Sequence, residues 1–196
     1  MTITAQLDVL TRVLDPADNT VGGGAASGIA GAMAAALTAM AARLSVRKVV
    51  AKPEAFYREL AAEAESLTTT LFAGADEDAR AFGAVSDAYR LPMATEEQKI
   101  SRSRAIQDAL VHAARVPLSN AEHCKRVLEL CRELQGHCNP NVSSDLECAA
   151  LLARAALLGC MSNLEANLRS IKDETARSSL EGQATRLRET GDLSGL

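Results

Sequence analysis

The sequence predicts an all-α protein, a bundle of about six to eight helices formed by a single domain that spans residues 1–196. No stretch alternates convincingly between apolar and polar residues, whereas apolar residues repeatedly recur at intervals of three and four. Hydrophobic residues make up 47% of the chain but aromatic residues only 3%, which favours close packing of Ala- and Leu-rich helices over a β-sandwich. A chain of 196 residues is long enough for one well-buried domain and short for two.

The first two predicted helices differ sharply in composition. A short helix is expected over residues 3–14, where leucine and valine residues recur on one side. A second helix follows the turn at residues 15–19 and ends near Ser45. Residues 21–40 carry no charge and little bulk, so we expect this helix to be buried on all sides. Small residues recur every four positions and form one row that a neighbouring backbone or a flat ligand can approach closely: Gly24, Gly28, Ala32 and Ala36.

Three glycines open this second helix. Gly22, Gly23 and Gly24 leave backbone N–H groups uncovered at the helix N-terminus, where a carboxylate, a phosphate or a polar ring can bind. Asn19 or Thr20 is predicted to cap this end. The stretch is too poor in large apolar residues to favour a membrane span, and no strand precedes it as a dinucleotide fingerprint requires. No Gly-Lys-Ser/Thr follows, which excludes a P-loop, and the simplest alternative is a closely packed core or dimer helix.

Turn and capping signals delimit the remaining helices. Pro53 suits the first turn of a third helix, which stops before Leu91-Pro92. A capping box at residues 95–98 opens a fourth helix, and Val116-Pro117 is expected to kink or break it, so that another begins near Ser119. The predicted ranges are 53–89, 96–114, 119–136 and 144–161, then a last helix from about Ser162 that thins into a polar tail from about residue 178.

Charge and cysteine content exclude several classes of partner. The 21 basic and 25 acidic residues give a net charge of -4, which argues against nucleic acid or an anionic membrane as the main partner. The five cysteines include no Cys-x-x-Cys pair, and together with the three histidines they lack the spacing of a metal site. We therefore expect a cytoplasmic protein without a metal, in which the cysteines are small apolar core residues: Cys124, Cys131, Cys138, Cys148 and Cys160.

Several polar residues stand in otherwise apolar surroundings. Asp78 is followed by Ala79, and Asn163 and Asn167 lie four apart on one face of a Leu- and Ala-rich helix. A buried carboxylate is costly unless it is paired or used, and desolvation can give it a pKa suited to proton transfer. Each residue also has a simpler explanation, as an exposed helix acid, a cap or a turn residue. By themselves they predict a polar pocket in a helical protein, together with a second group in one turn: Asn139, Asn141, Ser144 and Asp145.

Basic residues gather just past the small-residue helix. Arg43, Arg47 and Lys48 complement the dipole at a helix C-terminus, which is the ordinary reason for cations there. The alternative is a receptor for the acidic tail of a substrate.

The order of these motifs resembles the cyclodeaminase/cyclohydrolase family. That family includes the C-terminal half of formiminotransferase-cyclodeaminase and stand-alone bacterial methenyltetrahydrofolate cyclohydrolases. Met93 stands where the family usually has Lys, and Val21 and Ala25 stand where it usually has Pro and Ser. The resemblance covers roughly residues 5 to 175 and rests on Gly22-Gly23-Gly24-Ala25-Ala26, Asp78-Ala79-Arg80-Ala81-Phe82, Tyr89-Arg90-Leu91-Pro92, Arg102, Val116-Pro117-Leu118, Ser144-Asp145 and Asn163-x-x-x-Asn167.

The resemblance implies a homodimeric helical bundle that binds a folate near the glycine-rich segment. As a cyclohydrolase, the protein would add water to the cationic N5,N10-methenyl bridge of tetrahydrofolate and form 10-formyltetrahydrofolate. As a cyclodeaminase, it would let N10 attack a 5-formimino carbon while ammonia departs. We favour the cyclohydrolase, because the chain shows no formiminotransferase half to supply the formimino compound. A non-catalytic helical dimer that binds a folate or a partner is the second alternative, and no cofactor beyond the tetrahydrofolate substrate is implied.

The same resemblance suggests roles for individual residues. A carboxylate suits both reactions, since it moves protons and stabilises positive charge, so Asp78 is the first catalytic candidate and Asp145 the second. The residues expected to bind substrate are Gly22, Gly23 and Gly24 through backbone approach, Asn163 and Asn167 through the ring or water, Arg47, Lys48 and Arg102 through the glutamate tail, and in addition Ser27, Asn141 and Ser144.

Overall fold

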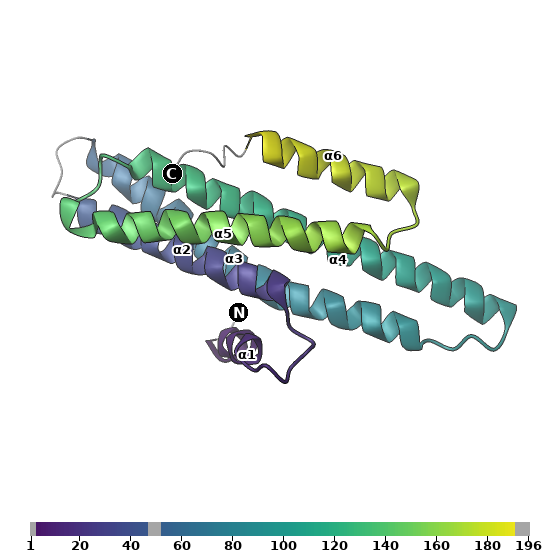
Figure 1. Ribbon diagram of the computed structural model, residues 1–196. Coiled ribbons are helices and arrows are strands. Elements are labelled where there is room, and N and C mark those ends of the chain that lie inside the picture. The colour runs from purple at the N-terminus through teal and green to yellow at the C-terminus, as the bar shows by residue number, and fades with distance from the viewer. Residues whose placement is uncertain (1–2, 47–51, 191–196) are drawn as a thin grey trace.

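The computed structural model describes residues 3–46 and 52–190, and in this part of the chain it contains six α-helices and no strand (Figure 1). The all-α prediction is therefore confirmed. The helices are α1 (Ile3–Val13), α2 (Gly23–Ser45), α3 (Glu54–Arg90), α4 (Glu96–Leu134), α5 (Ser143–Leu168) and α6 (Glu174–Thr190), with a short 3-10 turn at Pro140–Val142 before α5.

Four long helices form the body of the molecule. α2 packs between α3 and α5, and α4 packs against the same two helices from the opposite corner, with fewer contacts between α2 and α4. α1 lies against α2 and α3, and α6 covers α4 and α5. α3 and α4 are the longest helices, and their hairpin extends beyond the ends of α2 and α5 (Figure 1). The bundle thus has one end where α2 begins, α5 finishes and the other two helices continue.

The small residues of α2 allow close helix contacts, as the four-residue spacing predicts. A Cβ at Gly28 would meet the backbone of Ala75 in α3 at 3.1 Å, and one at Gly31 would meet the thiol of Cys124 in α4 at 2.7 Å. Burial on all sides is wrong, however, because Met33 and Leu44 are 52% and 48% exposed. α2 is the one helix of the described residues that is long and apolar enough to cross a membrane, and 61% of its most apolar window is buried inside the bundle.

Pro117 lies inside α4 and does not break it. α4 runs without interruption from Glu96 to Leu134, so the helix predicted to begin near Ser119 is a continuation. An interior proline costs about 3 kcal/mol of helix stability. Here Val116, Pro117 and Leu118 are all buried against neighbouring helices, and this tertiary packing outweighs the local preference to break.

Two further boundaries differ from the prediction at the C-terminal side. α5 continues through Ser162 to Leu168, so no separate helix begins at that serine. The predicted polar tail from about residue 178 is wrong, because α6 spans Glu174–Thr190 and buries Leu180, Ala184 and Leu187. These three residues recur at intervals of four and three and so form one apolar stripe on a helix that is otherwise polar.

Caps and cysteines give mixed outcomes. The capping box is confirmed, since the Thr95 side chain accepts from the Gln98 N–H and the Gln98 side chain accepts in return. The predicted caps of α2, Asn19 and Thr20, are wrong, because Gly22 occupies the N-cap and has no side chain to offer. Three cysteines are buried as expected, Cys138 is partly exposed, and the prediction is wrong for Cys148, which is exposed.

Candidate active site

The N-terminus of α2 is capped from another helix. Gly22 provides no side-chain acceptor, and the backbone N–H of Ala25, in the first turn, donates instead to the carboxylate of Asp78 on α3. An anion in this position also meets the positive end of the helix dipole. The sequence motif of three glycines and the candidate acid therefore belong to one site.

Gly24 makes room for this contact. A Cβ at position 24 would collide with both carboxylate oxygens of Asp78 and with Nδ2 of Asn163 on α5. Gly22 and Gly23 differ, because a Cβ at either position would meet no atom within 4 Å. Gly24 is thus the glycine that the contact between Asp78 and Asn163 requires. Gly22 and Gly23 instead leave open space at the start of α2.

Two asparagines of α5 extend the site into a chain of hydrogen bonds. Asn163 donates through Nδ2 to Oδ1 of Asp78 at 2.9 Å. Asn167, one turn later, donates through Nδ2 to the backbone carbonyl of Ala113 on α4 at 2.7 Å and lies 3.4 Å from Oδ1 of Asn163. Side chains or backbone groups of all four bundle helices meet here.

Burial dominates the electrostatics of Asp78. Desolvation raises the pKa of its carboxyl, while the bonds from Asn163 and Ala25 act in the opposite direction because they favour the charged form. The carboxyl is therefore more easily protonated than an exposed aspartate and is still held in a defined orientation. These are the properties of a group that takes up and returns a proton during a reaction.

An exposed aromatic residue follows Asp78 along α3. Phe82 follows Asp78 by one helical turn on the same face of α3, and its side chain is 54% exposed. The ring offers a flat apolar surface at the open end of the bundle, suited to stacking against another flat ring. The sequence contained a signal for it, the spacing of four residues between the acid and the phenylalanine.

The other predicted site residues are dispersed. Ser27 lies in the next turn of α2, where its hydroxyl donates to the Gly23 carbonyl at 2.7 Å and sits against Gly159 of α5. Arg102 binds the carbonyl of Tyr89 at 2.9 Å, eleven residues and about 16 Å along α3 from Asp78. Arg47 and Lys48 lie outside the described residues.

Asn141, Ser144 and Asp145 lie at the opposite end of the bundle. Eighteen residues of α5 separate Asp145 from Asn163, a distance of about 27 Å along the helix. Within one protomer, then, the two catalytic candidates are not in one site. Asn141 donates its backbone N–H to the Asn139 side chain, while Ser144 and Asp145 occupy the first turn of α5 without capping it.

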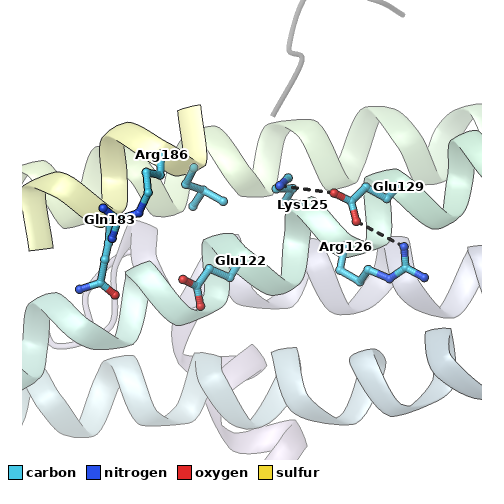
Figure 2. A pocket seen from close by; sticks show the side chains of 7 residues that line it. Glu122, Lys125, Arg126, Glu129, Gln183 and Arg186 are labelled. Carbon is cyan, nitrogen blue, oxygen red and sulfur yellow. Dashed lines mark hydrogen bonds and ion pairs between the residues drawn. The ribbon is translucent and has the colours of Figure 1, made fainter. Parts of the chain in front are cut away.

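A second concave region lies between α4 and α6, with a volume of about 360 Å³. Figure 2 shows that charged side chains of both signs line it, and Glu129 lies 3.4 Å from Lys125 and 3.3 Å from Arg126. Arg126 also binds Glu63 and Glu133. Because these charges compensate one another, the groove is a weaker candidate than the Asp78 site. The described residues contain no group of three or more His, Cys, Asp or Glu side chains placed to hold a metal ion.

Comparison with known proteins identifies the family. A family profile described as formiminotransferase-cyclodeaminase matches residues 6–186. Methenyltetrahydrofolate cyclohydrolase of Methylorubrum extorquens is 37% identical over 155 residues, which are 79% of this chain and 74% of that protein. Formimidoyltransferase-cyclodeaminase of Gallus gallus is 28% identical over 188 residues, which are 95% of this chain but only 35% of that longer protein.

A solved structure shows the same fold. Formiminotetrahydrofolate cyclodeaminase from Thermotoga maritima aligns with a TM-score of 0.77 and 28% identity, over 96% of this chain and 89% of that chain. The resemblance carried by the ordered motifs is thereby confirmed, and the chain belongs to the formiminotransferase-cyclodeaminase family.

Proposed function

We propose that this protein is a methenyltetrahydrofolate cyclohydrolase and that Asp78 transfers the protons of the reaction. The observation that carries the proposal is the Asp78 carboxylate itself, half-buried, bonded by Asn163 at 2.9 Å and by the N-terminus of α2, and followed one turn later by the exposed ring of Phe82. The cyclohydrolase of Methylorubrum extorquens, which this chain matches over most of both lengths, supports the same reaction.

The site can carry out each proton transfer that the hydrolysis needs. Water attacks the methenyl carbon and gives a proton to Asp78, so that the cationic ring becomes a neutral adduct. The bond to N5 then breaks, N5 takes the proton from Asp78, and the hydroxyl proton leaves to solvent as the formyl group forms on N10. Before the attack, the ionised carboxylate stabilises the positive charge of the substrate. Hydrolysis by this route requires no cofactor other than the tetrahydrofolate substrate.

The open surface beside the carboxylate suits a folate ring. Phe82 offers a stacking face, and the space at Gly22 and Gly23 lets a polar ring edge approach the backbone of the first turn of α2. Asn163 and Asn167 line the inner side of this surface and orient the ring or the attacking water. Arg102 lies about 16 Å farther along the α3–α4 hairpin, and in this proposal it would meet the acidic tail of an extended substrate.

Cyclodeaminase activity is the second candidate, supported by the Thermotoga maritima structure and the Gallus gallus relative. The same carboxylate would protonate the departing ammonia, so the geometry of Asp78 serves either reaction. Only the substrate distinguishes the two enzymes, and a non-catalytic folate-binding dimer would turn over neither.

Absorbance decay of methenyltetrahydrofolate tests the proposal directly. We expect hydrolysis well above the buffer rate, reduced roughly 100-fold or more in Asp78→Asn, because general acid–base catalysis contributes a factor of that order. Glu77→Gln is the matched control, since Glu77 neighbours Asp78 on α3 but is engaged with Arg80 and His112 on the outer surface. Decay at the buffer rate with wild-type protein would contradict the proposal, and ammonia release from 5-formiminotetrahydrofolate would then support the cyclodeaminase.

We also propose that the protein is a cytoplasmic homodimer that pairs through the outer face of α2 and α5. Neither α1 nor α6 packs across this face, since α1 lies against α2 and α3 and α6 lies against α4 and α5. Four large apolar side chains are about half exposed there: Met33, Leu44, Leu151 and Leu158. A self-complementary apolar patch of this kind is typical of a two-fold dimer interface.

A two-fold axis near the middle of α5 gives the dispersed residues a common site. Leu151 and Leu158 lie on either side of its midpoint, and a two-fold axis that passes between them would make the two copies of α5 run antiparallel. Asp145 and Ser144 of one protomer would then lie beside the Asn163–Asn167 turn of its partner. Light scattering tests the interface: Leu151→Glu should yield monomers, whereas Leu14→Glu, at a still more exposed leucine of the N-terminal segment, should leave the dimer intact. A dimeric Leu151→Glu protein would exclude this face.

A further inference from the structure

The proline inside α4 leaves one backbone carbonyl without its usual helical donor. Pro117 has no N–H, so the carbonyl of Ala113, four residues earlier, receives no bond from position 117. Asn167 of α5 supplies the missing donor, with Nδ2 at 2.7 Å from that carbonyl oxygen. A side chain of α5 therefore satisfies the carbonyl that Pro117 leaves without a helical donor in α4.

This bond fixes the orientation of the two side-chain amides that lie between Pro117 and Asp78, those of Asn167 and Asn163. A carbonyl oxygen only accepts, so Asn167 must turn its NH2 group towards Ala113. The same NH2 group lies 3.4 Å from Oδ1 of Asn163, which turns the oxygen of Asn163 towards Asn167 and its NH2 towards the carboxylate, 2.9 Å away. The Ala113 carbonyl thus selects the orientation of the Asn167 amide, and Asn167 in turn favours the orientation in which Asn163 donates to Asp78.

We propose that Pro117 is a positioning residue, which frees the Ala113 carbonyl so that Asn167 and Asn163 are oriented to keep an N–H donor on the Asp78 carboxylate. Pro117 itself is buried among neighbouring helices and acts only through these amides. With an ordinary residue at position 117, its N–H would bond to Ala113 and Asn167 would lose its fixed partner. Asn163 would then be free to turn its oxygen towards Asp78 whenever that carboxyl is protonated, because a protonated carboxyl donates a hydrogen bond and an ionised one only accepts.

Charged groups around Asp78 do not provide an alternative source of this orientation. On α3, Asp76 and Glu77 pair with Arg80, and Glu77 also meets His112 of α4. On α5, Glu165 pairs with Arg188 of α6. The first turn of α2 carries no charged residue. The groups that bond directly to the carboxylate are the Asn163 amide and the Ala25 N–H.

Two substitutions and their combination test the relay. Pro117→Ala restores a backbone N–H at position 117, and Asn167→Ala removes the first amide. In both variants we expect the titration midpoint of Asp78 to move to higher pH, because the bond that favours the charged form is lost. Carbon NMR of the Asp78 carboxyl group measures the midpoint, and Asp78→Asn identifies its signal. The double variant should move it no further than either single variant, since both act on one chain of bonds.

Val116→Ala is the matched control. It removes the same number of side-chain carbons from the adjacent buried position of α4 but leaves the N–H pattern around Ala113 unchanged. Its Asp78 midpoint should equal that of the wild type. A wild-type midpoint in Pro117→Ala, an equal shift in Val116→Ala, or additive shifts in the double variant would each overturn the proposal.

Kinetics add a second readout that rests on the proposed function. The acidic limb of the pH–rate profile should move to higher pH in Pro117→Ala, with kcat lowered roughly tenfold on that limb, because a carboxyl with a higher pKa is ionised in a smaller fraction of the enzyme there. The NMR titration uses no substrate. A shifted midpoint in a protein that fails to hydrolyse methenyltetrahydrofolate would therefore uphold the relay and reject the cyclohydrolase, while an unshifted midpoint in an active enzyme would do the reverse.

Discussion

The amide of Asn163 and the carboxylate of Asp78 are 85 residues apart in sequence and 2.9 Å apart in space. Their meeting depends on a third helix, because Gly24 of α2 leaves the volume in which the two polar groups lie. The carboxylate in turn caps α2 through the N–H of Ala25. One contact therefore both closes the bundle at this end and orients the group that we assign to proton transfer.

Gly24→Ala should disrupt this arrangement, because the added methyl collides with Asp78 and Asn163. We expect a loss of about 1–3 kcal/mol in the free energy of unfolding, which is typical of overpacking, and a strong loss of cyclohydrolase activity. Gly83→Ala on α3 is the control, since a methyl there meets no atom within 4 Å and should add about 0.5–1 kcal/mol of helix stability. Equal denaturation midpoints for the two variants would show that Gly24 is not needed for the close contact.

Asp78→Asn should alter the pH dependence of stability. Burial raises the pKa of this carboxyl above 3.8, so the unfolded chain ionises at a lower pH than the folded protein. Ionisation of the unfolded chain therefore destabilises the fold as the pH rises above 3.8, and the effect is complete above the folded pKa. The asparagine variant lacks this effect, so its Tm relative to the wild type should be higher at about pH 7 than at about pH 4. A difference in Tm that does not change with pH would contradict the desolvation of Asp78.

Mixed dimers should reveal whether Asp145 completes the site of a partner. Asp78→Asn and Asp145→Asn homodimers would each have two damaged sites. A dimer with one subunit of each kind would have one site with both carboxylates intact, so random mixing should restore about a quarter of wild-type activity. Differently tagged subunits confirm that subunits exchange between the dimers. If activity does not recover after this exchange, Asp145 lies outside the active site.

The sequence predicts the components of the site better than their arrangement. The uncharged row of small residues indicates a helix that others approach closely, and Asp78, Asn163 and Asn167 are conspicuous because they interrupt apolar surroundings. Local patterns do not reveal which helices pair, so the sequence allows Asp145 and Asp78 to be assigned to one site. In a protomer, however, about 27 Å of α5 separates Asp145 from Asn163, the residue that bonds to Asp78.

Pro117 shows why a local rule can fail. The proline predicts a break when α4 is considered alone, since it removes one bond of the helix. In the bundle the lost donor is replaced by Asn167, from a helix that begins 26 residues after Pro117. The spacing of Ala113 and Pro117 is visible in the sequence, but the asparagine that satisfies the carbonyl is identified only by the fold.

α6 provides the last prediction, because its polar composition conceals an apolar stripe. Leu180 is only 4% exposed and packs with the core formed by α4 and α5, together with Ala184 and Leu187. Leu180→Ala should therefore lower the free energy of unfolding by about 2–3 kcal/mol, as expected when a buried leucine is truncated near the edge of a core. Thr185→Ala, on the exposed side of α6, should change it by less than about 0.5 kcal/mol. Urea denaturation of both variants measures the difference, and equal midpoints would mean that α6 contributes nothing to the stability of the bundle, as a polar tail would.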